Sequence, residues 1–299
     1  MKRYLFSIAF LVAVSLLNAQ TKEDQDREKR FQDEAAKGRD TTRALGWSPA
    51  VVVGANLNQA SFKDWAAGGV NSMAYGVLVV GRLEHVWETS DWSNVLKLTF
   101  GQAKVGDQEF RKTDDEIYFE SIYVYRVGTL INPYAALSIR TQSAPGYEYP
   151  GDTARTQISA FWDPAYLTQS AGTSIRIFPE LSTRLGVAAR EVMTSQFTSY
   201  ADDKATTEVE KTRIDGGLES VTSLNWPFAE NMLLVSRLEL FAPFKAFDRM
   251  VVRWDNVLSA KVNSLVNVNL TFQLLNDVNI SPYTQMKESL AIGLSYNFL

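Results

Sequence analysis

The sequence predicts an all-β fold, a transmembrane antiparallel up-and-down β-barrel of about twelve strands. Three observations lead to this prediction. Apolar and polar side chains alternate strictly in the last two segments of the chain, similar period-two segments follow one another from Trp47 onward, and the connections between them alternate between short and long. A period of two is that of a β-strand.

The two C-terminal segments, 265–275 and 289–299, show the pattern most clearly. Each has about ten residues or more, whereas strands in soluble sheets average about five or six. A tilted strand needs about nine to eleven residues to cross a bilayer. The polar faces of both segments carry small uncharged side chains, which suits a wet interior.

The chain ends in alternating aromatic side chains, Tyr296 and Phe298, followed by Leu299. Such an end resembles the C-terminal membrane-insertion signal of bacterial outer-membrane β-barrels, although Leu299 departs from the usual aromatic last residue. The resemblance implies insertion by the barrel-assembly machinery and contact with outer-membrane lipid.

The first residues, 1–19, have the features of a signal peptide: Lys2 and Arg3, an apolar run, and a small residue, Ala19, at the expected cleavage site. A retained anchor helix would need about twenty apolar residues. The expected location is therefore the outer membrane of a Gram-negative bacterium after cleavage of the signal peptide. Residues 20–46 are expected to form a charged periplasmic tail, because this segment has too few apolar side chains to bury a core, and residues 47–299 the outer-membrane barrel.

Composition excludes several classes of protein. A net charge of −4 is too small to indicate a nucleic-acid partner, and the absence of cysteine excludes disulfides and thiol chemistry. No stretch after the leader has the pattern of a membrane-spanning helix. A membrane location would therefore require a closed barrel, since every backbone polar group must be satisfied in lipid.

Short and long connections alternate between the expected strands. The first two strands are placed at about 49–58 and 71–86, where Leu83 alternates with Arg82 and Glu84. The third alternates around Leu98. The expected long connections are 59–69, 104–115, 143–168, 196–211, 243–249 and 277–286, and the expected short ones are 87–92, 128–133, 179–181, 226–231 and 262–264.

The remaining strands follow the same rule. The fourth, at about 116–127, alternates tyrosines with glutamates, the fifth passes through Arg140, and the sixth is placed at about 170–178. The seventh passes through Arg184 and Arg190, and the eighth to tenth have charged residues on one face and leucine, valine or tryptophan on the other. The 143–168 connection is rich in proline and aromatic residues and could fold over the barrel mouth or tuck inward.

Short turns and longer outer loops are typical of outer-membrane barrels with both termini in the periplasm. Trp87, Trp92, Trp226 and Phe228 fall at the expected short turns, where aromatic rings would lie at the level of the lipid headgroups. The alternative fold is a secreted soluble β-sandwich, in which the apolar faces pack on each other.

Catalytic motifs are absent from the sequence, and it has one histidine, His85. His85 lies on the apolar face of its strand beside Trp87, as expected of an interfacial side chain. We therefore expect no enzyme activity, no catalytic residue, no metal and no cofactor.

Charged side chains on the lipid face would cost about 2–4 kcal/mol each near the bilayer midplane, so we expect them to face the lumen. The expected lumen-facing charges are Arg82, Glu84, Lys97, Glu116, Glu120, Arg126, Arg140, Arg184, Arg190, Arg213, Asp215, Glu219, Arg237, Glu239, Arg253, Asp255 and Lys261. Basic residues outnumber acidic ones in this set.

If hairpins pair about their loop centres, opposite charges become neighbours across the eighth to tenth strands. The expected pairs are Glu219 with Arg237, Arg237 with Asp255, and Glu239 with Arg253. The charges could fill the lumen by neutralising each other, or line a conducting pore with a weak preference for anions.

Three stretches, 61–72, 161–172 and 253–263 running into the terminal hairpin, resemble an uncharacterised domain-of-unknown-function family of Gram-negative outer-membrane β-barrel proteins. The resemblance implies the fold and the location. It assigns no chemistry to any residue.

The function expected from the sequence is a narrow pore or small-solute transport barrel. The alternative is a non-conducting scaffold or a surface-binding barrel that holds a periplasmic or surface partner through 143–168 or the charged tail.

Overall fold

The computed structural model describes residues 45–63, 66–150, 154–203, 206–263 and 266–297. The expected signal peptide at 1–19, almost all of the tail at 20–46, and Phe298 lie outside these residues. None of the described residues belongs to a helix that is long and apolar enough to cross a membrane.

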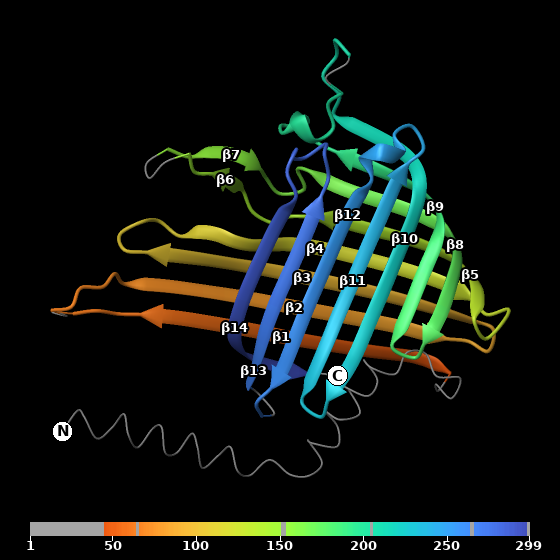
Figure 1. Cartoon of the computed structure of the whole chain (residues 1–299), viewed down its shortest axis with the longest axis horizontal. Coiled ribbons are helices and arrows are strands. Elements are labelled where there is room, and N and C mark those ends of the chain that lie inside the picture. Colours follow the sequence, from red (N-terminus) through yellow and green to blue (C-terminus); the bar gives the residue numbers. More distant parts are fainter. Residues whose placement is uncertain (1–44, 64–65, 151–153, 204–205, 264–265, 298–299) are drawn as a thin grey trace.

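Twelve strands form one closed antiparallel barrel (Figure 1). They are β1 Gly46–Ala60, β2 Ser72–Val86, β3 Ser90–Val105, β4 Arg111–Tyr125, β5 Ile131–Thr141, β8 Ala165–Phe178, β9 Leu181–Met193, β10 Thr212–Ala229, β11 Met232–Pro243, β12 Val251–Lys261, β13 Val266–Asn276 and β14 Gln285–Asn297. Each has 11 to 18 residues, enough to cross a bilayer when tilted.

The barrel closes where β1 pairs with β14, with Val52 opposite Asn297. Every strand therefore has a hydrogen-bonded neighbour on both sides, and the barrel has no free edge. This closure confirms the predicted fold class, and the alternative of a β-sandwich is wrong because the strands form one closed sheet.

Several strands are longer than predicted. β4 begins at Arg111, inside the expected 104–115 loop, and β8 begins at Ala165, before the expected 170–178 strand. The predicted turn 226–231 is also wrong, since β10 continues to Ala229 and the turn consists of Glu230 and Asn231. Polar and aromatic residues at strand ends remain hydrogen-bonded in the sheet, so residue type alone makes the connections appear longer than they are.

The longest connection contains a separate hairpin, β6 Gly146–Glu148 with β7 Thr156–Ser159, which the sequence analysis did not predict. Figure 1 shows it at the end of the barrel that carries the long connections, which we call the loop side. The carboxylate of Asp115 fastens it there by accepting hydrogen bonds from the backbone amides of Ser143 (2.8 Å) and Ala144 (2.9 Å).

Short 3-10 helices lie in two other loops on this side, η2 Thr198–Tyr200 and η3 Phe247–Arg249. The Tyr200 hydroxyl donates to the carbonyl of Ile158 at 3.2 Å, and the Gln196 amide donates to the Asp163 carboxylate at 2.7 Å. The loop between β9 and β10 is thereby joined to the loop that carries β6 and β7.

The outer face of the barrel is apolar. Large side chains such as Val187, Leu290 and Ile292 are 57%, 68% and 62% exposed. Aromatic rings gather at the opposite end, the turn side: Trp47 packs against His85 (4.5 Å between centroids), and His85 packs against Trp87 (4.0 Å). This arrangement matches an apolar band bordered by an aromatic girdle.

One pair of glycines allows β8 and β9 to approach closely. Gly172 lies opposite Gly186 in the register. A Cβ atom added to Gly186 would lie 2.3 Å from the carbonyl oxygen of Ala171, and one added to Gly172 would lie 2.1 Å from that of Leu185. Since these contacts are with backbone, no side-chain movement can relieve them.

We predict that Gly186→Val lowers the yield of folded barrel, because the added side chain forces β8 and β9 apart. The measurement is the heat-dependent shift in gel mobility of folded barrels after refolding in detergent. Gly81→Val is the control, since a Cβ at Gly81 meets no atom within 4 Å. Equal yields of folded protein for the two variants would contradict the prediction.

Candidate functional site in the barrel lumen

The candidate site is a set of ion pairs that crosses the lumen, which we call the lumen network. Its members are Lys97, Glu116, Glu120, Arg140, Arg184, Arg237, Glu239, Arg253 and Asp255. They come from β3, β4, β5, β9, β11 and β12. In the strand order, β4 and β11 lie on nearly opposite sides of the barrel, so contacts between them cross its interior.

Glu120 of β4 is the most enclosed carboxylate of the network, with a side chain that is 6% exposed. It accepts hydrogen bonds from Arg184 Nη2 at 2.6 Å and from Arg237 Nη2 at 2.8 Å. Arg237 Nη2 also donates to the Tyr118 hydroxyl at 3.0 Å. Glu120 thus joins β9 and β11 to β4 through hydrogen bonds between charged groups, which are stronger than neutral ones.

Glu116, four residues earlier on the same face of β4, makes a second crossing. Its carboxylate lies 2.7 Å from Arg253 Nη2, 3.1 Å from Lys97 Nζ and 3.4 Å from Arg140 Nε. Glu116 therefore connects β12 on one side of the lumen with β3 and β5 on the other.

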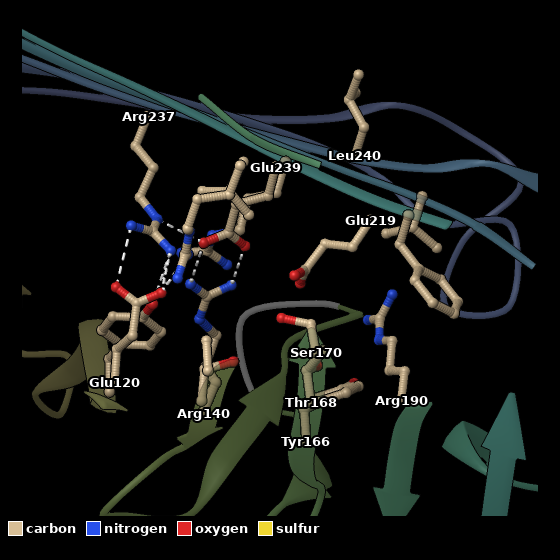
Figure 2. A pocket seen from close by; sticks show the side chains of 18 of the residues that line it. Glu120, Arg140, Tyr166, Thr168, Ser170, Arg190, Glu219, Arg237, Glu239 and Leu240 are labelled. Atoms are coloured by element: carbon tan, nitrogen blue, oxygen red, sulfur yellow. Dashed lines mark hydrogen bonds and ion pairs between the residues drawn. The ribbon is translucent and has the colours of Figure 1, made fainter. Parts of the chain in front are cut away.

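Glu239 completes the network from the β11 side. Arg237 Nε donates to it at 2.7 Å and Arg140 Nη1 at 3.3 Å, so this carboxylate also contacts both walls (Figure 2). Arg253 has a further partner in Asp255, at 2.8 Å. Each of the three glutamates is thus matched by at least two cations, which offsets the cost of removing these charges from water.

A cavity of about 150 Å³ lies beside the network. Its lining extends from Glu120 and Arg237 to Arg190, Tyr166 and Ile280, and Ile280 belongs to the loop between β13 and β14. The cavity therefore reaches from the network toward the loop side. Arg190 Nη2 donates to the buried carboxylate of Asp277 at 3.2 Å at this end.

Most of the expected lumen-facing charges lie in this region, and others form separate groups. Arg213 pairs with Asp215 at 3.0 Å, and Glu84 accepts a hydrogen bond from Ser93 at 3.2 Å. Arg126 lies one residue beyond β4, at the turn side, where it contacts Asp91 and donates to the carbonyl of Trp87. Arg82 and Lys261 lie on β2 and β12, outside the network.

Two of the three predicted cross-strand pairs are confirmed. Arg237 lies opposite Asp255 and Glu239 opposite Arg253. The pairing of Glu219 with Arg237 is wrong, because Glu219 lies opposite Phe241 and Arg237 opposite Ser223. The turn between β10 and β11 is shorter than predicted, which shifts the register, and Glu219 instead lines the cavity.

Sequence analysis did not single out four residues that take part in contacts inside the barrel or at its loop side. Tyr118 could have been found, because it shares the inward face of β4 with Glu116 and Glu120. Asp277 lies in a loop, and Lys287 and Asp114, which form an ion pair (2.7 Å), lie near the loop-side ends of β14 and β4, before the strands predicted from the sequence begin.

Other expected site residues have simpler surroundings. His85 lies between Trp47 and Trp87 in the aromatic cluster at the turn side. The backbone of Tyr296, part of the expected insertion signal, pairs with Val53 where the barrel closes. Within the described part of the chain, no three His, Asp or Glu side chains are grouped in a way that could hold a metal ion.

We predict that Glu120→Gln lowers the free energy of unfolding by about 3–5 kcal/mol, because Arg184 and Arg237 lose a buried counter-charge. Urea unfolding in lipid vesicles measures this. Glu109→Gln is the matched control, since Glu109 and its partner Arg155 are 82% and 55% exposed and an exposed pair contributes about 0–1 kcal/mol. Losses of equal size in the two variants would contradict a central role for Glu120.

Comparisons with known proteins give fold-level likenesses. No curated protein sequence matches the chain. The translocator domain of autotransporter NalP from Neisseria meningitidis is 11% identical in sequence, with a TM-score of 0.40. The match covers 91% of this chain and 95% of the NalP chain. The COG4313 outer membrane channel from Pseudomonas putida F1 is 10% identical, with a TM-score of 0.38, and the match covers 86% of this chain and 96% of the channel.

The NanC porin is also 10% identical, with coverages of 83% and 98% and a TM-score of 0.38. At these identities no residue role transfers to this chain. In sequence, residues 57–147 match the family model described as protein of unknown function (DUF3078), which confirms the resemblance to an uncharacterised family over a segment that carries Glu116, Glu120 and Arg140 of the lumen network.

Proposed function

We propose that this protein is an outer-membrane barrel through which small solutes pass, and that the lumen network holds the passage narrow and closed at rest. The observation that carries the proposal is the crossing of the lumen by Glu116 and Glu120, which contact arginines of the opposite wall. The apolar outer face and the strand lengths support the membrane location.

Charge in the lumen supports passage rather than simple filling. A buried ion pair adds little stability compared with apolar side chains of the same volume. Small or apolar residues would therefore fill an inert lumen at least as well as nine charged ones. Ionisable groups inside a membrane protein commonly mark the route of a substrate or ion.

The balance of charge supports a weak preference for anions. The lumen network contains five basic residues and four acidic ones. Because the lumen is enclosed by a wall of low dielectric constant, even a small excess of positive charge favours entry of anions.

We predict that the double variant Glu120→Ala with Arg237→Ala conducts severalfold more than the unchanged protein, because it removes the central crossing without altering net charge. Single-channel recording in planar bilayers measures the conductance, and the reversal potential in a salt gradient reports anion preference. Arg213→Ala with Asp215→Ala is the control, an ion pair outside the lumen network. A double variant that conducts no more than this control would refute the proposed passage.

One observation favours a second function, the binding of a partner at the cell surface. Phe161 and Trp162 are 65% and 43% exposed beside the β6 and β7 hairpin, and the neighbouring loops are fastened by hydrogen bonds. Exposed aromatic groups on a fixed support are typical of binding surfaces.

We predict that a photo-crosslinking residue at position 161 forms a discrete adduct in living cells, whereas one at Val209, also exposed on the loop side, does not. Gel mobility of the crosslinked barrel is the measurement. The same adducts from both positions, or none from position 161, would exclude this surface as a binding site.

A further inference from the structure

The loop between β13 and β14, residues 277–284, reaches over the lumen to the wall formed by β9. The side chain of Asp277 is fully buried, and its carboxylate accepts a hydrogen bond from Arg190 Nη2 of β9 at 3.2 Å. Three strands, β10, β11 and β12, separate β9 from β13 in the barrel. Ile280, in the middle of the loop, lines the cavity. The loop therefore covers the cavity at its loop-side end.

The internal structure of this loop depends on Asp277. Its Oδ1 accepts hydrogen bonds from the backbone amide and from the side-chain amide of Asn279, both at 3.0 Å. Its backbone carbonyl accepts from the amides of Ile280 (2.9 Å) and Ser281 (3.0 Å). The turn from 277 to 281 is therefore a compact unit built on Asp277, and Ile280 is part of that unit.

Few contacts hold this unit to the rest of the barrel. Among the described residues, the ion pair of Asp277 with Arg190 is the one hydrogen-bonded contact between the loop and a strand other than β13 and β14. Val278 and Tyr283 of the loop are 45% and 78% exposed. The connections that carry η2 and the β6 and β7 hairpin are instead joined to each other and to Asp115 by several hydrogen bonds. An exposed segment that is attached at one point opens at a lower free energy than the sheet does.

Arg190 is a fixed point of attachment on the wall. Its guanidinium carbon lies 5.5 Å from the ring centroid of Tyr166 on β8 and 5.9 Å from that of Phe241 on β11, within the range of cation-π contacts. Figure 2 shows its side chain directed from β9 into the lumen. Because both rings belong to barrel strands, Arg190 keeps its position when the ion pair with Asp277 breaks.

We propose that residues 277–284 form a lid on the loop-side entrance of the lumen, and that the ion pair of Asp277 with Arg190 holds the lid closed. This inference rests on the proposed function, for which it names the element that controls entry. With the pair formed, Ile280 covers the cavity. With the pair broken, the turn built on Asp277 moves away as a unit and the cavity opens to the loop side. Arg190 is not a member of the lumen network, so the lid opens without breaking an ion pair of the network.

A single cysteine at position 280 measures opening of the lid. The natural chain contains no cysteine, so Ile280→Cys gives the full-length barrel one thiol. Because position 280 lines the cavity, a bulky water-soluble thiol reagent reacts with it rapidly only when the lid is open. We expect Asp277→Asn to increase the labelling rate of Ile280→Cys in lipid vesicles by about tenfold or more, as for the loss of a hydrogen bond between charged groups.

Two further variants separate the charge of Asp277 from its structural role. Asp277→Glu keeps the charge and is expected to label more slowly than Asp277→Asn. Asp107→Asn is the matched control, the same change at an exposed residue of the loop-side connection between β3 and β4, and it should leave the labelling rate unchanged. Heat-dependent gel mobility confirms that each variant is folded. Arg190→Gln removes the same ion pair from the wall side and takes the place of Asp277→Asn if that variant does not fold.

The outcomes separate the lid from the proposed function. Equal labelling rates with and without Asp277→Asn, or an equal increase from Asp107→Asn, would overturn the lid. In single-channel recording we expect Asp277→Asn to conduct for a larger fraction of the time than Asp107→Asn. Faster labelling of Asp277→Asn in a barrel that never conducts would support the lid and count against passage. Conductance that both variants share, with unchanged labelling, would leave passage intact and overturn the lid.

Discussion

The structure depends on one constraint, the pairing of every barrel strand with two neighbours. The hydrogen bonds between β1 and β14 close the sheet, and closure removes the unpaired backbone groups that lipid cannot satisfy. Once the sheet is closed, alternate side chains must point either to the outside or to the lumen. The exposed apolar residues of β9 and β14 and the charged residues of β4 and β11 are two results of the same alternation.

Charged side chains inside this barrel are extensively paired, and this pairing offsets the cost of removing them from water. Glu116, Glu120 and Glu239 each bind at least two cations, and most of these contacts join strands far apart in the sequence. Removal of one partner leaves the others without compensation, so the network acts as a unit. The same contacts that join the walls also cross the lumen, so under the proposed function solute movement would require ion pairs to exchange partners.

The loop-side cavity differs from the network in its balance of partners. In the network, acidic and basic groups satisfy each other, whereas Glu219 in the cavity wall forms no ion pair with a described residue and lies near Ser170. The cavity extends from the crossing at Glu120 toward the loop side, as far as Ile280. Arg184 contributes to both features, because it lines the cavity and donates to Glu120 at the crossing.

The sequence by itself determined the barrel, because strand length and a period of two are local properties. Strands that cross a membrane can satisfy all their backbone groups only in a closed sheet. It also gave two of the three cross-strand charge pairs, which follow from the centre of the loop between β11 and β12. The local pattern could not predict the cross-strand neighbour of Glu219, because the register of β10 on β11 depends on the position of a two-residue turn. The polar and aromatic residues at the end of β10 resemble turn residues, so the sequence does not show where this turn begins. Only the tertiary structure decided which charges meet across the lumen, because contacts such as Glu120 with Arg237 join residues more than a hundred positions apart, and their distance is set by the circumference and shape of the closed barrel.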